Sequence, residues 1–171
     1  MGVSFAVALA GRGFLTQMRD LLRRHPGTTI VWAHLGLGRV VHPVQDQASA
    51  GTAERSPRFG EIVESILSDP AMSHVYFDIS WDEVAKYAVA SPEAIRNTAT
   101  ILNKYPDRFL FGTDTVAPAD QATQLRVYKL WDPIWQLLTP EASQKIRLGN
   151  YERLFDAARV RVRTWEAANV K

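Results

Sequence analysis

The feature that most constrains the fold is a regular alternation between short apolar runs and longer segments with helical periodicity. Three apolar runs occupy 28–36 (TTIVWAHLG), 74–80 (HVYFDIS) and 108–114 (RFLFGTD). Helical patterns occupy 14–25, 59–68 and 92–105. Because strands alternate with helices, we expect parallel βαβ units. The nearly continuous apolar character of the runs predicts a sheet with both faces covered.

Hydroxyl–proline pairs indicate where helices begin. Each places a hydroxyl at the N-cap and a proline at the first helical position: Ser56-Pro57, Ser91-Pro92 and Thr139-Pro140. Asp132-Pro133 predicts a fourth start of the same kind. We expect Gly149 to end a helix and Asn150 to cap the last one.

Composition restricts the possible classes of function. A chain of 171 residues suits one domain with a sizeable core. No stretch approaches the roughly 18 apolar residues of a membrane span, and without cysteine there are no disulfides or thiolate metal sites. The net charge is only +2, and Arg159, Arg161 and Arg163 spread around a helix rather than forming a stripe. We therefore expect neither nucleic acid nor membrane as a partner, and a cytoplasmic location, since the N-terminus lacks the basic region of a signal peptide.

Polar side chains gather toward the C-terminal end of each apolar run. Strand alternation puts three sets on corresponding faces: Ile30, Trp32 and His34; Tyr76, Asp78 and Ser80; Leu110, Gly112 and Asp114. The opposite faces are purely apolar and suited to helix packing. In parallel α/β folds the working groups lie at the C-terminal ends of strands. A histidine and an aspartate that converge there can bind a divalent metal or exchange protons.

Each of these residues also has a structural alternative. His34 can be a core histidine bonded to a backbone carbonyl, and Asp114 can cap the turn that follows it. Asp78 fits a structural partner of an arginine or a backbone amide. Trp81 fits the lining of a pocket or a plug at the rim.

The longest segment without clear structure, 37–56, predicts a functional loop rather than a linker. It carries Arg39 and His42, which fit either solvent-exposed surface or substrate binding. His25 at a helix end and His74 at a strand start are expected to be structural. No glycine-rich phosphate loop follows a strand, so a flavodoxin-like phosphate-binding domain is disfavoured.

Four segments together resemble the amidohydrolase-related family: VWAHLGLG (31–38), VYFDIS (75–80), DRFLFGTD (107–114) and IRLGNYERLF (146–155). The resemblance implies a metal-dependent TIM-barrel hydrolase or decarboxylase, with these segments as strands six, seven and eight and the closing helix. It implies that Asp114 is a ligand of a divalent metal, which we expect to be zinc. It also implies that His34 is a proton-transfer residue beside the metal, and we take His34 as a second candidate ligand.

The chain also departs from the family pattern. The His-x-His or Glu-x-His pair of the first strand and the histidine of the fifth have no counterpart among the four histidines. A whole barrel needs about 250 residues. We therefore expect an α/β partial TIM barrel in which 1–171 is a single domain without the N-terminal barrel strands. It corresponds to about strands five/six to eight of the barrel plus the closing helices, and the segment 3–10 stands in place of strand five. Its metal site is expected to lack the ligands of the first strand.

The expected function is a metal-dependent hydrolase acting on C–N or C–O bonds, or a nonoxidative decarboxylase, of a small carboxylated substrate. Arg39 would pair with the substrate carboxylate, and His42 and Trp81 are further candidates for substrate binding. The alternative is a non-catalytic or truncated half-barrel whose open sheet edges bind a second copy or a complementing chain. A homo-oligomer or such a complementing chain is the expected assembly.

Overall fold

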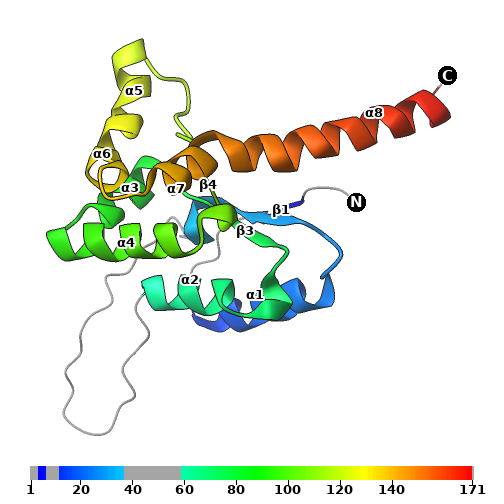
Figure 1. Cartoon of the computed structure of the whole chain (residues 1–171), viewed down its shortest axis with the longest axis horizontal. Coiled ribbons are helices and arrows are strands. Elements are labelled where there is room, and N and C mark those ends of the chain that lie inside the picture. The colour runs from blue at the N-terminus through cyan, green and yellow to red at the C-terminus, as the bar shows by residue number, and fades with distance from the viewer. Residues whose placement is uncertain (1–3, 7–11, 37–58, 171) are drawn as a thin grey trace, which may run out of the picture.

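The computed structural model describes residues 4–6, 12–36 and 59–170. The chain folds as alternating strands and helices around one parallel sheet with the order β1-β2-β3-β4 (Figure 1). The strands are β1 (Ser4–Ala6), β2 (Ile30–Trp32), β3 (Val75–Asp78) and β4 (Phe109–Leu110). The helices are α1 (Arg12–Arg24), α2 (Phe59–Leu67), α3 (Asp82–Ala88), α4 (Pro92–Lys104), α5 (Gln121–Leu130), α6 (Asp132–Trp135), α7 (Pro140–Gln144) and α8 (Ala157–Asn169).

This α/β architecture confirms the expected parallel strands and is compatible with a partial barrel. All three apolar runs contain a strand, and β1 lies within the segment 3–10. The assignment of these strands to positions five/six to eight of a barrel stays a prediction. So does the single domain over 1–171.

The hydrophobic core lies between the sheet and the helices that cover one of its faces. Leu22 of α1, Ile66 of α2 and Leu102 of α4 are almost fully buried against Phe77 of β3. Figure 1 places α1 and α2 on the side of the sheet away from α8. Burial of large apolar side chains on this scale is the main stabilising contribution to such a sheet, at about 1.5–3 kcal/mol for each side chain.

The prediction that Trp32 of β2 shares a face of the sheet with Asp78 of β3 is wrong. Trp32 pairs in register with Phe77, and their rings stack at 5.8 Å between centroids, so Trp32 faces the helices with the core. Asp78 is in register with Leu110, on the opposite face. The alternation rule extended β2 through His34, whereas the strand ends at Trp32 and the backbone turns immediately after it.

The predicted helix starts have mixed outcomes. Ser91 and Thr139 each accept a hydrogen bond from the backbone N–H three residues later and cap α4 and α7, as predicted. Asp132 is not a cap: it is the first residue of α6, and the cap position is Trp131 without a side-chain bond. Ser56 lies outside the described residues.

The predicted break at Gly149 and Asn150 is also wrong. The helix continues from α7 through two π-helical turns, Lys145–Gly149 and Glu152–Asp156, into α8. Asn150 has helical backbone angles and is almost fully buried. Its side-chain amide donates to the carbonyls of Pro106 (2.7 Å) and Phe109 (2.8 Å), so it joins this helix to the start of β4 instead of capping.

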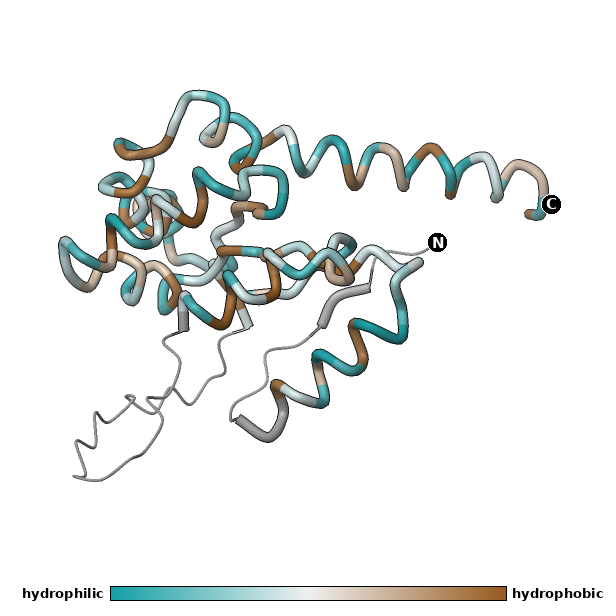
Figure 2. The backbone as a smooth tube through the Cα atoms, turned by 60° about the horizontal axis from the view of Figure 1, so that its bottom comes forward, coloured by the Kyte–Doolittle hydropathy of each residue, from teal (hydrophilic) through white to brown (hydrophobic). Residues whose placement is uncertain are grey.

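The last helix projects from the rest of the molecule. None of the α8 residues is buried, and Trp165 is 62% exposed. Figure 2 shows apolar and polar positions alternating along this projecting arm. Among the residues that the structure describes, no helix combines the length and apolar character that a membrane span requires.

Candidate functional site

Strained backbone marks the C-terminal ends of three neighbouring strands. His34 after β2 has φ 56°, Trp81 after β3 has φ 84°, and Asp114 after β4 has φ 49°. Positive φ at residues other than glycine costs on the order of 1–3 kcal/mol each and persists where surrounding contacts enforce it. Such strain at three adjacent strand ends indicates a site where side chains are held in specific directions.

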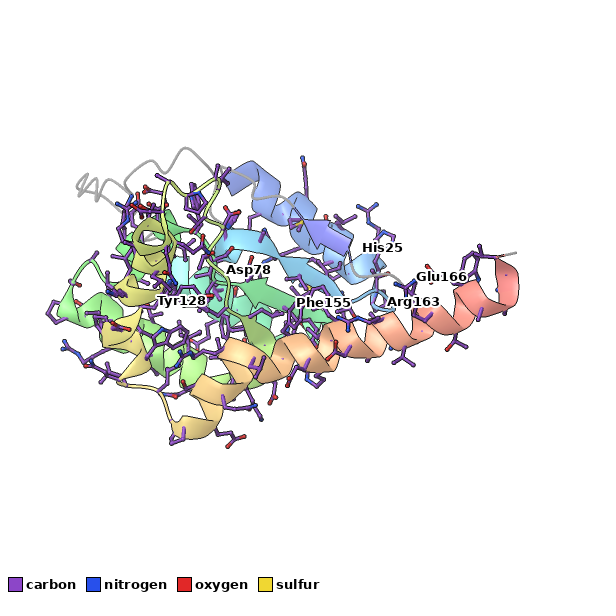
Figure 3. All side chains as sticks on the ribbon, turned by 90° about the horizontal axis from the view of Figure 1, so that it is seen from above. His25, Asp78, Tyr128, Phe155, Arg163 and Glu166 are labelled. Carbon is purple, nitrogen blue, oxygen red and sulfur yellow. The ribbon has the colours of Figure 1, made fainter. Side chains whose placement is uncertain are left out.

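His34 lies at the centre of a chain of polar contacts. Its Nδ1 is 3.1 Å from Ser80 Oγ, and its Nε2 is 3.6 Å from Asp114 Oδ2. Ser80 Oγ donates to Asp78 Oδ2 at 2.6 Å, and the Ser80 backbone N–H donates to Asp78 Oδ1 at 2.8 Å. The contacts join His34, Ser80, Asp78 and Asp114, at the ends of β2, β3 and β4, into one polar row. Figure 3 labels Asp78 near the middle of the molecule.

His34 reaches this row because the chain turns sharply after β2. His34, Leu35 and Gly36 all have positive φ. A Cβ at Gly36 would lie 2.9 Å from the Trp32 ring, so only glycine fits against the indole. The turn, rather than strand alternation, brings the imidazole to the side of Ser80 and Asp114.

Two features hold the other side of the row in place. Gly112 packs directly against it, since a Cβ there would lie 3.3 Å from Ser80 Cβ. The Trp81 N–H donates to the Thr113 carbonyl at 3.2 Å, which ties the end of β3 to the segment that carries Asp114. The Trp81 ring lies 5.2 Å from the His34 ring and forms a wall beside it.

The electrostatics distinguish the two carboxyl groups. Burial raises the pKa of Asp78, while the hydrogen bonds from the Ser80 side chain and backbone and the nearby His34 oppose that rise. Asp114 adds a small further rise to the Asp78 pKa. The Asp114 side chain is 44% exposed and that of His34 24%, so this pair is open to a ligand, whereas Asp78 is partly buried at the other end of the row.

The spacing of His34 and Asp114 fits two positions of a divalent-metal site. Two ligand atoms on one tetrahedral zinc lie about 3.4 Å apart, close to the 3.6 Å between His34 Nε2 and Asp114 Oδ2. Within 12–36 and 59–170, however, no group of three histidine, aspartate or glutamate side chains is placed to hold an ion. The described residues therefore fit two positions of a metal site and do not complete it.

The structure accounts for the other candidates differently. Arg39 and His42 lie outside the described residues. His74 Nε2 bonds to the Leu22 carbonyl at 3.0 Å, which is a structural role as expected. Sequence reasoning left Asp78 open as the structural partner of an arginine or a backbone amide; it bonds a backbone amide and, in addition, the hydroxyl of Ser80, a link that no sequence motif predicted.

A separate cavity of about 490 Å³ lies among α2, α3 and α4. Leu35, Ile79, Tyr87 and Ile101 are among its lining residues, whereas His34 and Asp114 do not line it. The cavity is therefore distinct from the row of polar groups at the strand ends.

Comparisons with known proteins place this geometry in a family. Neither the curated proteins nor the solved structures give a significant match. A family model described as amidohydrolase matches residues 13–157, which include the strands β2 to β4 and every residue of the polar row. That match covers most of the 171 residues. The chain belongs to the amidohydrolase family.

Proposed function

We propose that this chain supplies His34 and Asp114 as catalytic residues to a metal-dependent hydrolase, or a nonoxidative decarboxylase, of small carboxylated substrates. The observation that carries the proposal is the 3.6 Å approach of His34 Nε2 to Asp114 Oδ2 at the C-terminal ends of parallel strands. Family membership supports the reaction class, and working groups of α/β folds lie at this edge.

His34 suits proton transfer because an imidazole near neutral pH serves as both base and acid. In hydrolysis, Nε2 takes a proton from the attacking water and returns it to the departing nitrogen or oxygen. In decarboxylation, Nε2 first takes up a proton from water and then delivers it to the ring carbon, where it replaces the departing carbon dioxide. The flat Trp81 ring beside it offers an apolar surface against which a small ring can lie.

Amidohydrolases are generally metal-dependent, and we propose zinc bound by Asp114. His34 is the second candidate ligand; if its Nε2 binds the metal, that nitrogen cannot also act as the base. The remaining ligands must come from groups outside the described residues, since zinc sites use three or four. A bound zinc ion would lower the pKa of its water to about 7 and would polarise a carbonyl group. Arg39 and His42 remain proposed substrate-binding residues, and the cytoplasmic location remains a prediction.

Zinc titration of the purified chain, followed by calorimetry, tests the proposal. We expect about one ion per chain for the wild type and loss of binding for Asp114→Asn, which keeps the shape but removes the charge. Asp120→Asn is the matched control, because Asp120 caps α5 by accepting from the Thr123 N–H and asparagine caps equally well. Equal zinc affinity in wild type and Asp114→Asn would contradict the proposed ligand.

Two assays then separate the reactions. Hydrolysis of activated esters and amides reports on the first, and release of labelled carbon dioxide from carboxylated aromatic rings reports on the second. We expect one of them to depend on both His34 and Asp114. Absence of both activities in a chain that binds zinc would reject the catalytic role and leave the metal site.

A second candidate is a half-barrel that pairs with a second copy or a complementing chain. In the described part of the sheet, β1 has a neighbour on one side only, and an open strand edge is a template for pairing. Light scattering distinguishes the two candidates: a metal-free dimer or larger assembly without activity favours this one.

A further inference from the structure

The buried side of the polar row has no role in the function proposed above. Ser80 is only 3% exposed, and its hydroxyl lies between Asp78 and His34. We propose that Asp78 is a positioning residue which, through Ser80, fixes the proton of neutral His34 on Nδ1 and leaves Nε2 as the basic nitrogen. The importance of this role for catalysis rests on the proposed function, whereas the proton position follows from the contacts alone.

The argument starts from the direction of the hydrogen bonds. A carboxylate only accepts, and Asp78 receives both the N–H and the hydroxyl of Ser80, at 2.8 and 2.6 Å. A serine hydroxyl has one proton, so toward His34 the same oxygen can only accept. The 3.1 Å contact therefore needs a proton on His34 Nδ1.

The surroundings prevent the alternative arrangement. Ser80 is too buried for water to take the place of either partner, and Gly112 lies so near that a Cβ on it would stand 3.3 Å from Ser80 Cβ. The strained backbone at His34 holds the ring close to the hydroxyl. If the hydrogen bonds ran in the opposite direction, the Ser80 hydroxyl would donate to His34 Nδ1. It would then no longer donate to the Asp78 carboxylate, which is the stronger acceptor.

The consequence lies at the exposed end of the imidazole. With Nδ1 protonated, the lone pair of Nε2 faces Asp114 Oδ2 across 3.6 Å, beyond hydrogen-bond distance. Two acceptors face one another there, so the gap suits a proton, a cation or the hydrogen of a bound water. Asp78 thus keeps Nε2 ready to accept, although it touches neither the ring nor the gap.

Nitrogen-15 NMR of the imidazole rings measures the proton position directly. The uniformly labelled full chain is observed at about pH 8.5, where unperturbed imidazole is neutral, and His34 is assigned by its loss in His34→Gln. His74 is an internal reference with the opposite tautomer, because its Nε2 must carry a proton to donate to the Leu22 carbonyl. We expect Nδ1–H for His34 and Nε2–H for His74 in one spectrum.

Asp78→Asn is the decisive variant. Asparagine accepts the Ser80 N–H through its oxygen, and its amide then donates to Ser80 Oγ. The hydroxyl proton turns toward His34 Nδ1, so we expect the His34 proton to move to Nε2 while His74 does not change. Ser80→Ala should leave a mixture of both tautomers, and Ser80→Thr should restore Nδ1–H because it keeps the hydroxyl.

Several outcomes overturn the proposal. A proton on Nε2 of His34 in the wild-type chain does so without any variant, so a failure of Asp78→Asn to fold leaves the test intact. An unchanged tautomer in folded Asp78→Asn also does so. Asp82→Asn, which changes a half-exposed carboxylate paired with Lys86, is the control and should change neither histidine.

The NMR result is independent of the proposed function, since it needs neither metal nor substrate. If the chain is active, Asp78→Asn should lower kcat about 10²-fold or more with little change in KM, because the base is lost while substrate contacts remain. The predicted tautomer in an inactive chain would reject the function and keep the positioning role.

Discussion

Gly112 is the residue on which the approach of β3 and β4 at the site depends. Its α-hydrogen faces Ser80, and a Cβ in its place would lie 3.3 Å from Ser80 Cβ and 3.8 Å from Asp78 Oδ1. The contact with Ser80 is tighter than side chains normally tolerate, so Ser80 would have to shift by a few tenths of an ångström. The glycine therefore determines the spacing of the polar row.

We predict that Gly112→Ala lowers the free energy of unfolding by about 1–3 kcal/mol, the usual cost of overpacking. Urea denaturation followed by circular dichroism measures this change. Gly27→Ala is the matched control, because a Cβ at Gly27 meets nothing within 4 Å, and we expect it to leave stability unchanged or slightly raised. Equal effects of the two substitutions would show that the space at Gly112 is unimportant.

The raised pKa of Asp78 makes a prediction about pH. The folded state holds the Asp78 proton more tightly than the unfolded chain, whose pKa is near 3.8. Its contribution to stability is therefore complete below that value and is lost as pH rises through the folded pKa. Asp78→Asn does not titrate, so its unfolding free energy relative to the wild type should increase with pH from about 3.8 upward. Urea denaturation across that range measures the difference, and a pH-independent difference would contradict it.

Single residues were predictable where chemistry alone decides and not where backbone turns decide. His34 and Asp114 were expected to converge because both follow apolar runs, and they lie 3.6 Å apart. The expected reason was strand alternation, which fails at β2 because His34 and Leu35 adopt positive φ. Neither residue type signals such a turn, so only the following Gly36 gave a local indication.

At the scale of elements, the long helical segment 140–169 depends on one buried amide. Asn150 donates to Pro106 and Phe109 just before and within the start of β4, and Arg153 one turn later donates to the Asp107 carbonyl at 2.9 Å. These bonds satisfy backbone carbonyls of the turn before β4 and of the first residue of β4. They fix the helix against the strand that the segment with Asp114 follows.

Asn150→Ala should destabilise the fold by about 2–3 kcal/mol, because two buried carbonyls lose their donor. Asn169→Ala is the control: Asn169 also donates to a backbone carbonyl, that of Trp165, but at an exposed position. We expect a change within about 0.5 kcal/mol for this control. Thermal and urea denaturation of both variants decide the point, and similar losses would mean that burial of Asn150 contributes nothing.

Elements were predictable from periodicity and caps, and their junctions were not. The proline-marked starts at Ser91 and Thr139 were confirmed because the bonding is local in sequence. The break at Gly149 and Asn150 was wrong because the partners of the Asn150 amide lie about forty residues earlier in the chain. A Gly-Asn pair signals a helix end only when no distant backbone competes for the asparagine.

At the scale of the whole molecule, two parts differ in how they are held. The body of sheet and helices shares one core, whereas α8 has no buried residue and projects away from it (Figure 1). The amidohydrolase match ends at residue 157, where α8 begins. The parts that the family match covers are thus the parts that pack together.

We therefore predict that a chain ending after residue 157 keeps its stability within about 0.5 kcal/mol, since it loses no buried side chain of α8. A chain ending after residue 144 is the contrasting variant, because it also loses the buried residues Ile146 and Asn150, and we expect it to lose cooperative unfolding. Calorimetry of both truncations distinguishes these results. The described core does not need α8. A large loss of stability in the chain that ends after residue 157 would therefore mean that α8 is held by contacts with another chain. Light scattering before and after removal of α8 would then show the assembly dissociate.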